Sequence, residues 1–311
     1  MSPRWAGLWR FVGWVLVFLM AGVGQAVAAR VAVVMSDDSA PYLDVYQLIQ
    51  SYLGDTPHQV SRVIAEGLTS ASLDEVNLAV VVGVRAAEAL AALPERPPVL
   101  AVLVPRVWYL KTGRNRLSDG GRRTVSALYL DQPFERQAKL IRLAFPDARR
   151  VGVLLSADQD WLTGELDEAL RSQRLSLVHA TLAGDEQLIT PLENVLSESD
   201  LLLAVPDPLV FNRNTAQSLF LTSYRYRDPV MGYSRSMTRA GALLSLYSSP
   251  AQLGRQAAEW VRNALNNMPV RLPSPAYPAY FDISINEQVA RSLGFTLPPE
   301  DELEKRMEGS R

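Results

Sequence analysis

Side chains able to bind a small molecule follow the predicted strands, at the points where loops begin. They carry hydroxyl, carboxylate, guanidinium and aromatic groups, which together supply hydrogen bonds, ion pairs and ring contacts. The candidates are Ser36, Asp37, Tyr42, Arg85, Arg106, Trp108, Trp161, Asp207 and Tyr233. In doubly wound sheets, ligands gather at the carboxyl ends of the strands. We therefore expect these residues to line a ligand-binding site.

Two tryptophans among these candidates are open to two interpretations. Trp108 and Trp161 each lie just past the end of a predicted strand, in different halves of the chain. An aromatic ring at each lip of a cleft would clamp a flat or apolar ligand. The alternative is that each ring packs its own loop onto the body of the protein.

Catalytic chemistry has little support in the sequence. His58 and His179 fall inside predicted strands with no acidic or nucleophilic motif beside them, so we expect structural roles for both. The pair Asp37 and Asp38 fits a helix N-cap better than a paired acid and base. Phosphate-loop, dinucleotide, zinc-helix and serine-elbow motifs are absent, and no Cys supplies a metal ligand. We expect a protein that is not an enzyme and that holds neither a metal nor a bound cofactor.

The charge of the chain argues against a nucleic-acid partner. The formal net charge is −2, and removal of residues 1–28 would take away two Arg and bring it to −4. Nucleic-acid binding usually requires a strongly basic face. The segment 111–123 has a local positive excess from Lys111, Arg114, Arg116, Arg122 and Arg123. Such a run is usually a solvated hairpin or linker, and the alternative is a docking surface for an acidic partner.

The first 28 residues have the pattern of a secretory signal. Arg4 and Arg10 precede the apolar run 11–23, and Ala26-Val27-Ala28 has the spacing of a cleavage site. We expect cleavage after Ala28, with Ala29 as the next choice. The alternative is an uncleaved anchor, but the run is shorter than the ~20 residues of a spanning helix. Because Cys is absent, a lipobox is excluded, and we expect a periplasmic protein that is not a lipoprotein.

The chain after residue 28 alternates short β-branched runs with amphipathic stretches. We predict strands at 30–35, 58–65, 78–82, 99–104, 124–130, 150–155, 175–180, 200–205, 229–233, 241–246 and 280–285. We predict helices at 42–53, 86–93, 134–145, 163–173, 187–196, 215–226, 250–266 and 286–293. Continuous apolar strands separated by helices are typical of parallel sheets covered on both faces.

The βα pattern restarts after residue 134, which predicts two doubly wound lobes of the α/β class. We expect an N-terminal lobe of 29–127 plus 246–269 and a C-terminal lobe of 128–245 plus 270–296. The charged tail 297–311 has no apolar run, and we expect it to be frayed or disordered.

The segment 129–155, YLDQPFERQAKLIRLAFPDARRVGVLL, resembles ABC-transporter substrate-binding proteins of the tryptophan/tyrosine-binding kind. In that family a helix ends in a Pro-containing turn and leads into an Arg-Val-Gly-Val strand. The resemblance continues through 200–212, 229–239, 241–243, 254–258, 285–286, 290–294 and Pro298. It covers about the last 60% of the chain in the right order.

The resemblance implies a type I periplasmic-binding-protein fold, with three crossovers near 126–130, 243–247 and 268–272. It also implies a function. The protein would be a monomer that binds a small-molecule solute and delivers it to an inner-membrane ABC permease by hinge closure. A second possibility is a periplasmic regulator or envelope-protein partner built on the same lobes, without a transport role. A periplasmic enzyme comes third.

The first lobe departs from the family pattern. Where the family has Gly-Thr-x-Ala-Ala and holds a ligand carboxylate, this chain has Gly83-Val84-Arg85-Ala86-Ala87. We expect Arg85 to pair with an anionic or zwitterionic ligand. The alternative is that it points into solvent from the start of its helix. The family's Asp-Pro loop is replaced by Pro105-Arg106-Val107-Trp108, and its Asp-Asn pair appears as Asp207-Pro208. We expect Asp207 to bind an ammonium or hydroxyl group from the other lobe.

Overall fold

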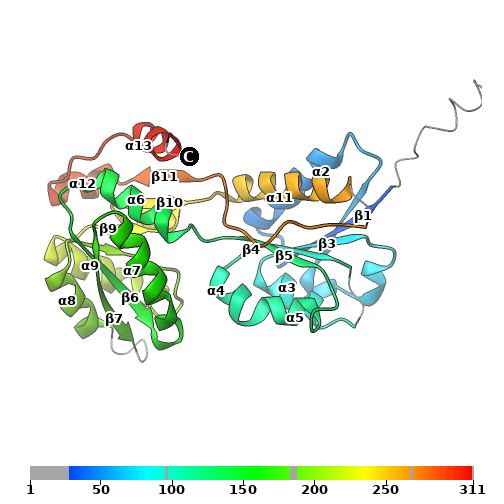
Figure 1. Cartoon of the computed structure of the whole chain (residues 1–311), viewed down its shortest axis with the longest axis horizontal. Coiled ribbons are helices and arrows are strands. Elements are labelled where there is room, and N and C mark those ends of the chain that lie inside the picture. Colours follow the sequence, from blue (N-terminus) through cyan, green and yellow to red (C-terminus); the bar gives the residue numbers. More distant parts are fainter. Residues whose placement is uncertain (1–27, 95–96, 183–187, 267–268, 310–311) are drawn as a thin grey trace, which may run out of the picture.

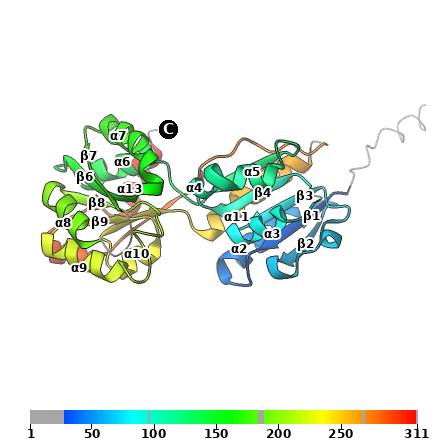
Figure 2. The same ribbon diagram turned by 90° about the horizontal axis from the view of Figure 1, so that it is seen from below.

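The protein is a two-lobed α/β molecule in this computed structural model, which describes residues 28–94, 97–182, 188–266 and 269–309. Figures 1 and 2 show the lobes side by side, joined by narrow crossing segments. The predicted signal segment lies outside the described residues, except for Ala28.

The first lobe is built on a five-stranded parallel sheet with the order β2-β1-β3-β4-β5. The strands are β1 (Arg30–Met35), β2 (Gln59–Ile64), β3 (Leu78–Val82), β4 (Val99–Val104) and β5 (Val125–Tyr129). β3 is central, and all of its residues are buried. Its sequence, LAVVV, is apolar throughout because a parallel strand with helices on both faces has no solvent side.

Helices cover both faces of this sheet (Figure 1). They are α2 (Ala40–Leu53), α3 (Val84–Ala91), α4 (Arg106–Trp108), α5 (Arg114–Ser118) and α11 (Pro250–Leu265). Val31 and Val33 of β1 pack with α2 and α11, whereas Ala32 and Val34 pack with α3 and α5. This alternation follows from the two-residue period of a strand. Short turns complete the lobe: η1 (Ala65–Gly67), η2 (Ser70–Leu73) and the π-turn η3 (Tyr109–Gly113).

The second lobe has a six-stranded sheet with the order β11-β10-β9-β8-β6-β7, in which β11 is antiparallel to β10. Its strands are β6 (Arg150–Ser156), β7 (Ser176–Leu182), β8 (Leu201–Leu203), β9 (Val230–Gly232), β10 (Leu244–Tyr247) and β11 (Asp282–Ile285). The helical segments are α6 (Phe134–Ala144), η4 (Ala157–Leu162), α7 (Thr163–Ser172), α8 (Ile189–Glu198), α9 (Ala216–Tyr226), α10 (Arg235–Ala240), α12 (Glu287–Leu293) and α13 (Glu300–Glu308). α6, α7 and α13 pack on one face, and α8 and α9 pack on the other. These two lobes have the type I periplasmic-binding-protein-like fold.

The chain crosses between the lobes at three places. The first crossing follows β5 at residues 130–133, and the second is Ser248 and Ser249, between β10 and α11. All three lie further along the chain than expected, because residues 126–129 are still in β5 and residues 244–247 are still in β10. The third, at residues 277–281, is displaced most. Val270 and Leu272 still pack in the first lobe, and Ala276 forms a parallel bridge with Leu128. This Pro-rich stretch has no periodic pattern from which its partner could have been predicted.

Two expectations about irregular segments were wrong. The tail forms helix α13, because Leu303 and Met307, four residues apart, are buried against α6 and β11. The segment 111–123 is not a solvated hairpin: it begins within η3 and continues as α5, and Leu117 is buried. Arg116 pairs with Glu88 at 3.3 Å, and Arg123 pairs with Asp119 at 3.8 Å.

Candidate ligand-binding cleft between the lobes

A cavity of about 430 Å³ lies where the crossovers meet the second lobe. The first crossover contributes Leu130, Asp131 and Gln132, and the second contributes Ser248, Ser249 and the adjoining Tyr247 and Pro250. The remaining lining residues are Pro206, Tyr233, Ser234, Arg235, Ser236 and Asp282. The lining combines hydroxyl groups, two tyrosine rings and charged side chains of both signs. Such a cavity suits a small polar solute, because a few placed polar groups orient a ligand whose remaining surface is covered.

A smaller cavity of about 20 Å³ adjoins the first and shares Asp131, Gln132, Pro206 and Tyr233 with it. Arg106 and Tyr277 also line it. Burial raises the pKa of Asp131, although its carboxylate accepts a hydrogen bond from the Arg106 backbone N–H at 2.6 Å. Burial likewise raises the pKa of Tyr233, and the nearby carboxylates of Asp207 and Asp131 act in the same direction. The two cavities therefore share part of one polar wall.

Arg106 spans the two lobes. It follows a bulge at the end of β4, where Leu103 has a φ of 56° and the pairing with β5 shifts register. Its guanidinium donates to both carboxylate oxygens of Glu165 on α7, at 2.8 and 2.9 Å. The rings of Trp161 and Tyr277 have their centres 5.7 Å from the guanidinium carbon. A second inter-lobe ion pair joins Lys111 and Asp158 at 3.9 Å.

Ser36 and Tyr42, two of the first-lobe candidates, support the turn between β3 and α3. The buried Ser36 hydroxyl donates to the Val82 carbonyl at 2.9 Å and accepts from the Ala86 N–H at 3.2 Å. Gly83 has a φ of +88°, and a Cβ there would lie 2.5 Å from Ser36 Oγ and 2.9 Å from the Tyr42 ring. Only glycine fits this position. Both side chains are thus engaged in holding the turn.

Asp37 and Arg85 lie at the carboxyl ends of β1 and β3, 3.9 Å apart, and their side chains are 47% and 68% exposed. Hydrogen bonds from Ser39 lower the pKa of Asp37, and Arg85 adds to this effect. Neither residue lines the two cavities. Both stay exposed where β1 and β3 end.

Asp207 is buried and bonded to its own lobe. One carboxylate oxygen accepts from the Ser156 N–H at 2.7 Å, and the other accepts from the Leu209 N–H at 3.0 Å. Tyr233 lines both cavities, and its ring contacts Phe211 edge-on with centres 6.1 Å apart. Tyr233 is therefore a cleft residue, whereas Asp207 joins the loop ends of β6 and β8.

The two tryptophans behave differently. Trp108 packs its own loop onto the first lobe, since a Cβ on Gly113 would lie 2.4 Å from its ring. Trp161 is 42% exposed and lies beside Arg106 of the other lobe. Of the residues proposed from the sequence, the structure brings Arg106, Trp161 and Tyr233 to the region between the lobes.

Residues 73–306 match a family model described as ABC transporter substrate binding protein. The chain belongs to this family of ABC transporter substrate-binding proteins. No curated protein sequence matches it.

Solved structures of similar architecture share the two-lobed fold with this substrate-binding family member. A conserved domain protein from Vibrio cholerae has 21% identity and a TM-score of 0.60, over 90% of this chain and 98% of that one. A substrate binding protein with adhesive properties from Clostridium difficile, in a ligand-free, open structure, has 15% identity and a TM-score of 0.69, over 88% and 97%. An ABC domain in complex with L-Trp from Streptococcus pneumonia has 16% identity and a TM-score of 0.59, over 89% and 98%.

Several cleft residues of this substrate-binding protein were not identified from its sequence. Asp131 and Gln132 lie two and three residues after β5, and Ser248 directly follows β10, so their place after a strand end was a usable signal. Glu165 and Tyr277 had none, because they come from a helix and an irregular segment. Within the described ranges, no group of three or more His, Asp or Glu side chains is placed to hold a metal ion. No described helix is both long and apolar enough to span a bilayer.

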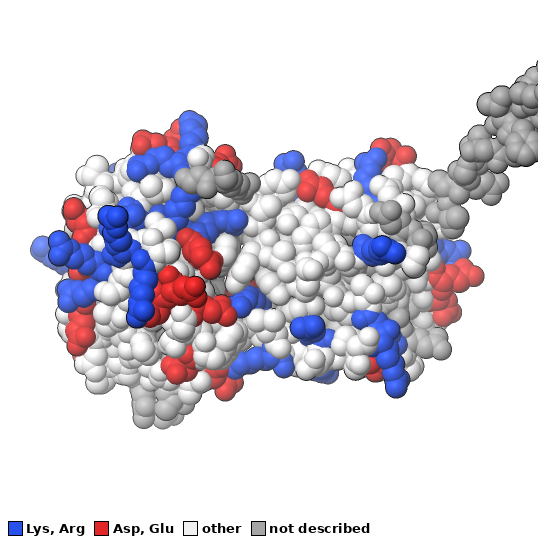
Figure 3. Space-filling model, viewed as in Figure 1, with Lys and Arg blue, Asp and Glu red and all other residues white. Residues whose placement is uncertain are grey.

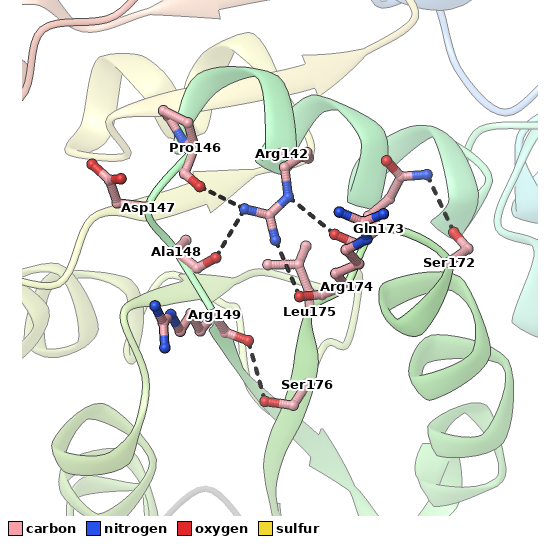
Figure 4. A pocket seen from close by; sticks show the side chains of 10 residues that line it. All are labelled: Arg142, Pro146, Asp147, Ala148, Arg149, Ser172, Gln173, Arg174, Leu175 and Ser176. Carbon is pink, nitrogen blue, oxygen red and sulfur yellow. Dashed lines mark hydrogen bonds between the residues drawn. The ribbon is translucent and has the colours of Figure 1, made fainter.

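A cavity of about 970 Å³ lies at the amino ends of β6 and β7, away from the cleft (Figure 4). Arg142 dominates it, and its guanidinium donates to the carbonyls of Gln173, Pro146, Ala148 and Arg174 at 2.7–3.1 Å. These bonds join the end of α6 to the end of α7. All three guanidinium nitrogens already donate to backbone carbonyls. We therefore assign this cavity a structural role.

Figure 3 shows acidic and basic side chains intermixed over the second lobe, at left.

Proposed function

We propose that this protein is a periplasmic solute-binding protein that delivers a small molecule to an inner-membrane ABC permease. Family membership supports a substrate-binding role. The observation that carries the proposal is the 430 Å³ cavity bordered by the crossovers, because rotation of one lobe on the other would open and close it. The protein works as a monomer, without a cofactor and without nucleic acid.

The site is proposed to comprise Arg106, Trp161, Tyr233 and the crossover residues Asp131 and Gln132. Arg85 and Asp37 are kept as contacts for a charged group of the solute at the first-lobe lip. Calorimetric titration of Arg85→Ala tests that part. An affinity within about twofold of the parent, under ~0.5 kcal/mol, would exclude Arg85 from the site.

A thermal-shift screen of the purified mature protein tests the binding function. The panel holds amino acids, aromatic compounds, nucleosides and organic anions, and a ligand at 100 times its Kd adds about 2.7 kcal/mol of stability. X-ray scattering with the best solute should then show a more compact molecule. Identical curves at saturation would favour the second candidate function, a periplasmic regulator or envelope-protein partner. The ion pairs Arg106–Glu165 and Lys111–Asp158, which already join the lobes, support that candidate.

Export is part of the proposal, with a secretory signal removed after Ala28. Ala29 is buried, and its carbonyl accepts from the Gln59 N–H at 2.9 Å. A cut after Ala29 would remove this bonded residue from the amino end of β1, so a mature chain that begins at Ala29 is expected. Intact-mass measurement of periplasmic protein tests this. A mature species that retains residues 1–23 in the membrane fraction would contradict it.

A further inference from the structure

The surroundings of Arg106 have the properties of a carboxylate-binding subsite. Its planar guanidinium presents two parallel N–H donors, the geometry that matches a carboxylate in a bidentate pair. The side chain is 18% exposed, and the rings of Trp161 and Tyr277 flank it. Low exposure strengthens such a charge-assisted pair relative to one on the surface.

The carboxylate that binds this pair of N–H donors, the guanidinium fork, belongs to the protein itself. Glu165 comes from the first turn of α7 in the opposite lobe, and its side chain is 43% exposed. Both of its carboxylate oxygens accept hydrogen bonds from Arg106. A rotation of its side chain toward solvent would free the fork without any change in the helix.

Arg106, by contrast, is held in place on its own side. Its backbone N–H donates to Asp131, and it lines the small cavity, which shares Asp131 and Tyr233 with the 430 Å³ cavity. The small cavity measures about 20 Å³, room for roughly one water. Because Glu165 accepts from both terminal nitrogens of the guanidinium, a carboxylate of a solute can bind this pair of donors only by displacing Glu165.

We propose that Arg106 is the subsite for a carboxylate of the solute, and that Glu165 is a built-in competitor that occupies it when no solute is bound. The inference rests on the solute-binding function proposed above. It names the solute class as a small carboxylate-bearing molecule, either an anion or a zwitterion. It also assigns Glu165 a role in specificity, since a solute without a carboxylate leaves the Arg106–Glu165 pair intact and gains nothing from the subsite.

The alternative role of Glu165 makes the opposite prediction. If the Arg106–Glu165 pair only stabilises the closed arrangement of the lobes, loss of the Glu165 charge weakens binding of every solute. If Glu165 competes with the solute, the same loss strengthens binding of carboxylates alone. Glu165→Gln keeps the size and shape of the side chain and removes the charge. Glu168→Gln, at an exposed position on the same helix, removes an equal charge and leaves the Arg106–Glu165 pair intact.

Calorimetry with three probes that share a phenyl ring on a two-carbon chain tests the proposal. They are 3-phenylpropionate, which carries a carboxylate, phenethylamine, which carries an amine, and L-phenylalanine, which carries both. The phenyl ring suits the aromatic rings beside Arg106. Glu165→Gln should raise the affinity for the two carboxylates roughly five- to tenfold, the value of a partly exposed ion pair, and leave phenethylamine unchanged. Glu168→Gln should change neither. Arg106→Lys, which keeps the charge and loses the fork, should weaken both carboxylates by about 30-fold or more.

Equal or lower carboxylate affinity in Glu165→Gln would overturn the proposal, as would an equal gain for phenethylamine. Failure of both carboxylates to bind Glu165→Gln at millimolar concentration would also overturn it. The solute-binding function is judged separately, by the wider thermal screen. An uncharged solute found there, with an affinity that does not change in Arg106→Lys, would leave that function standing and remove the subsite.

Discussion

The side-chain amide of Gln132 donates a hydrogen bond of 2.7 Å to the hydroxyl of Ser248. That hydroxyl donates in turn to the carbonyl of Tyr280 at 2.6 Å. The three residues belong to the three crossovers, so one buried hydroxyl links all the segments that join the lobes. The connection between the lobes therefore has a polar centre.

Ser248→Ala should lower the free energy of unfolding by about 1–3 kcal/mol, because it leaves the buried Gln132 amide and the partly buried Tyr280 carbonyl without their partner. Urea denaturation measures this. Ser126→Ala is the matched control: Ser126 is buried in β5, and its hydroxyl has no hydrogen-bond partner among the described residues. That variant should be neutral or slightly stabilising. An equal loss in both variants would mean that the Ser248 bonds contribute nothing specific.

Gly83→Ala should destabilise the first lobe. Its positive φ costs roughly 1–3 kcal/mol for a residue with a Cβ, and the added methyl would collide with Ser36 and Tyr42. Thermal unfolding measures the loss. Gly164→Ala, where an added Cβ meets no atom within 4 Å, should keep or gain stability by up to ~1 kcal/mol. Equal melting temperatures of the two variants would contradict the tight turn.

Asp207→Ala should cost about 2–4 kcal/mol of unfolding free energy, because the Ser156 and Leu209 N–H groups lose their acceptor. Asp207→Asn keeps one carbonyl oxygen and should lose less. Asp147→Ala, at an exposed position, should change little. If Asp207→Ala is as stable as the parent, the carboxylate does not hold these loops together.

Asp228 should give the protein a distinct pH dependence. Burial raises the pKa of this carboxyl from 3.8 to about 6, and the nearby Asp200 adds to the rise against the Ser199 hydrogen bond. A raised native pKa contributes stability that is present below pH 3.8 and is lost as the pH rises through 6. Relative to Asp228→Asn, the parent should lose stability between about pH 4 and pH 6, and the difference should then stay constant.

Asp200→Asn provides a control of opposite sign. Burial alone would raise the pKa of Asp200, but hydrogen bonds from the Arg149 and Arg150 N–H groups outweigh it and lower that pKa. Its contribution is present above pH 3.8 and is lost as the pH falls through the lowered native pKa. Denaturation of the parent and both variants across pH 3–8 compares the slopes. Parallel curves for Asp228→Asn and the parent would exclude a raised pKa.

The sequence by itself determined the strands, the longer helices and the fold class. Strands such as β1, β3 and β4 have the bounds predicted from continuous apolar runs, because a strand covered on both faces leaves no position for a polar residue. The restart of the βα pattern gave the two lobes. The tail helix was also readable, since Leu303 and Met307 have helical spacing, but its high charge hid them.

Only the tertiary structure decided what the loop side chains do. Ser36 and Asp207 have the residue types of a binding site, yet their side-chain oxygens accept hydrogen bonds from buried N–H groups of neighbouring loops. Arg106 and Glu165 are 59 positions apart and meet because two separate lobes bring their loop ends together. Sequence patterns report local periodicity and burial. Which polar groups satisfy one another across a cleft depends on the arrangement of both lobes in space.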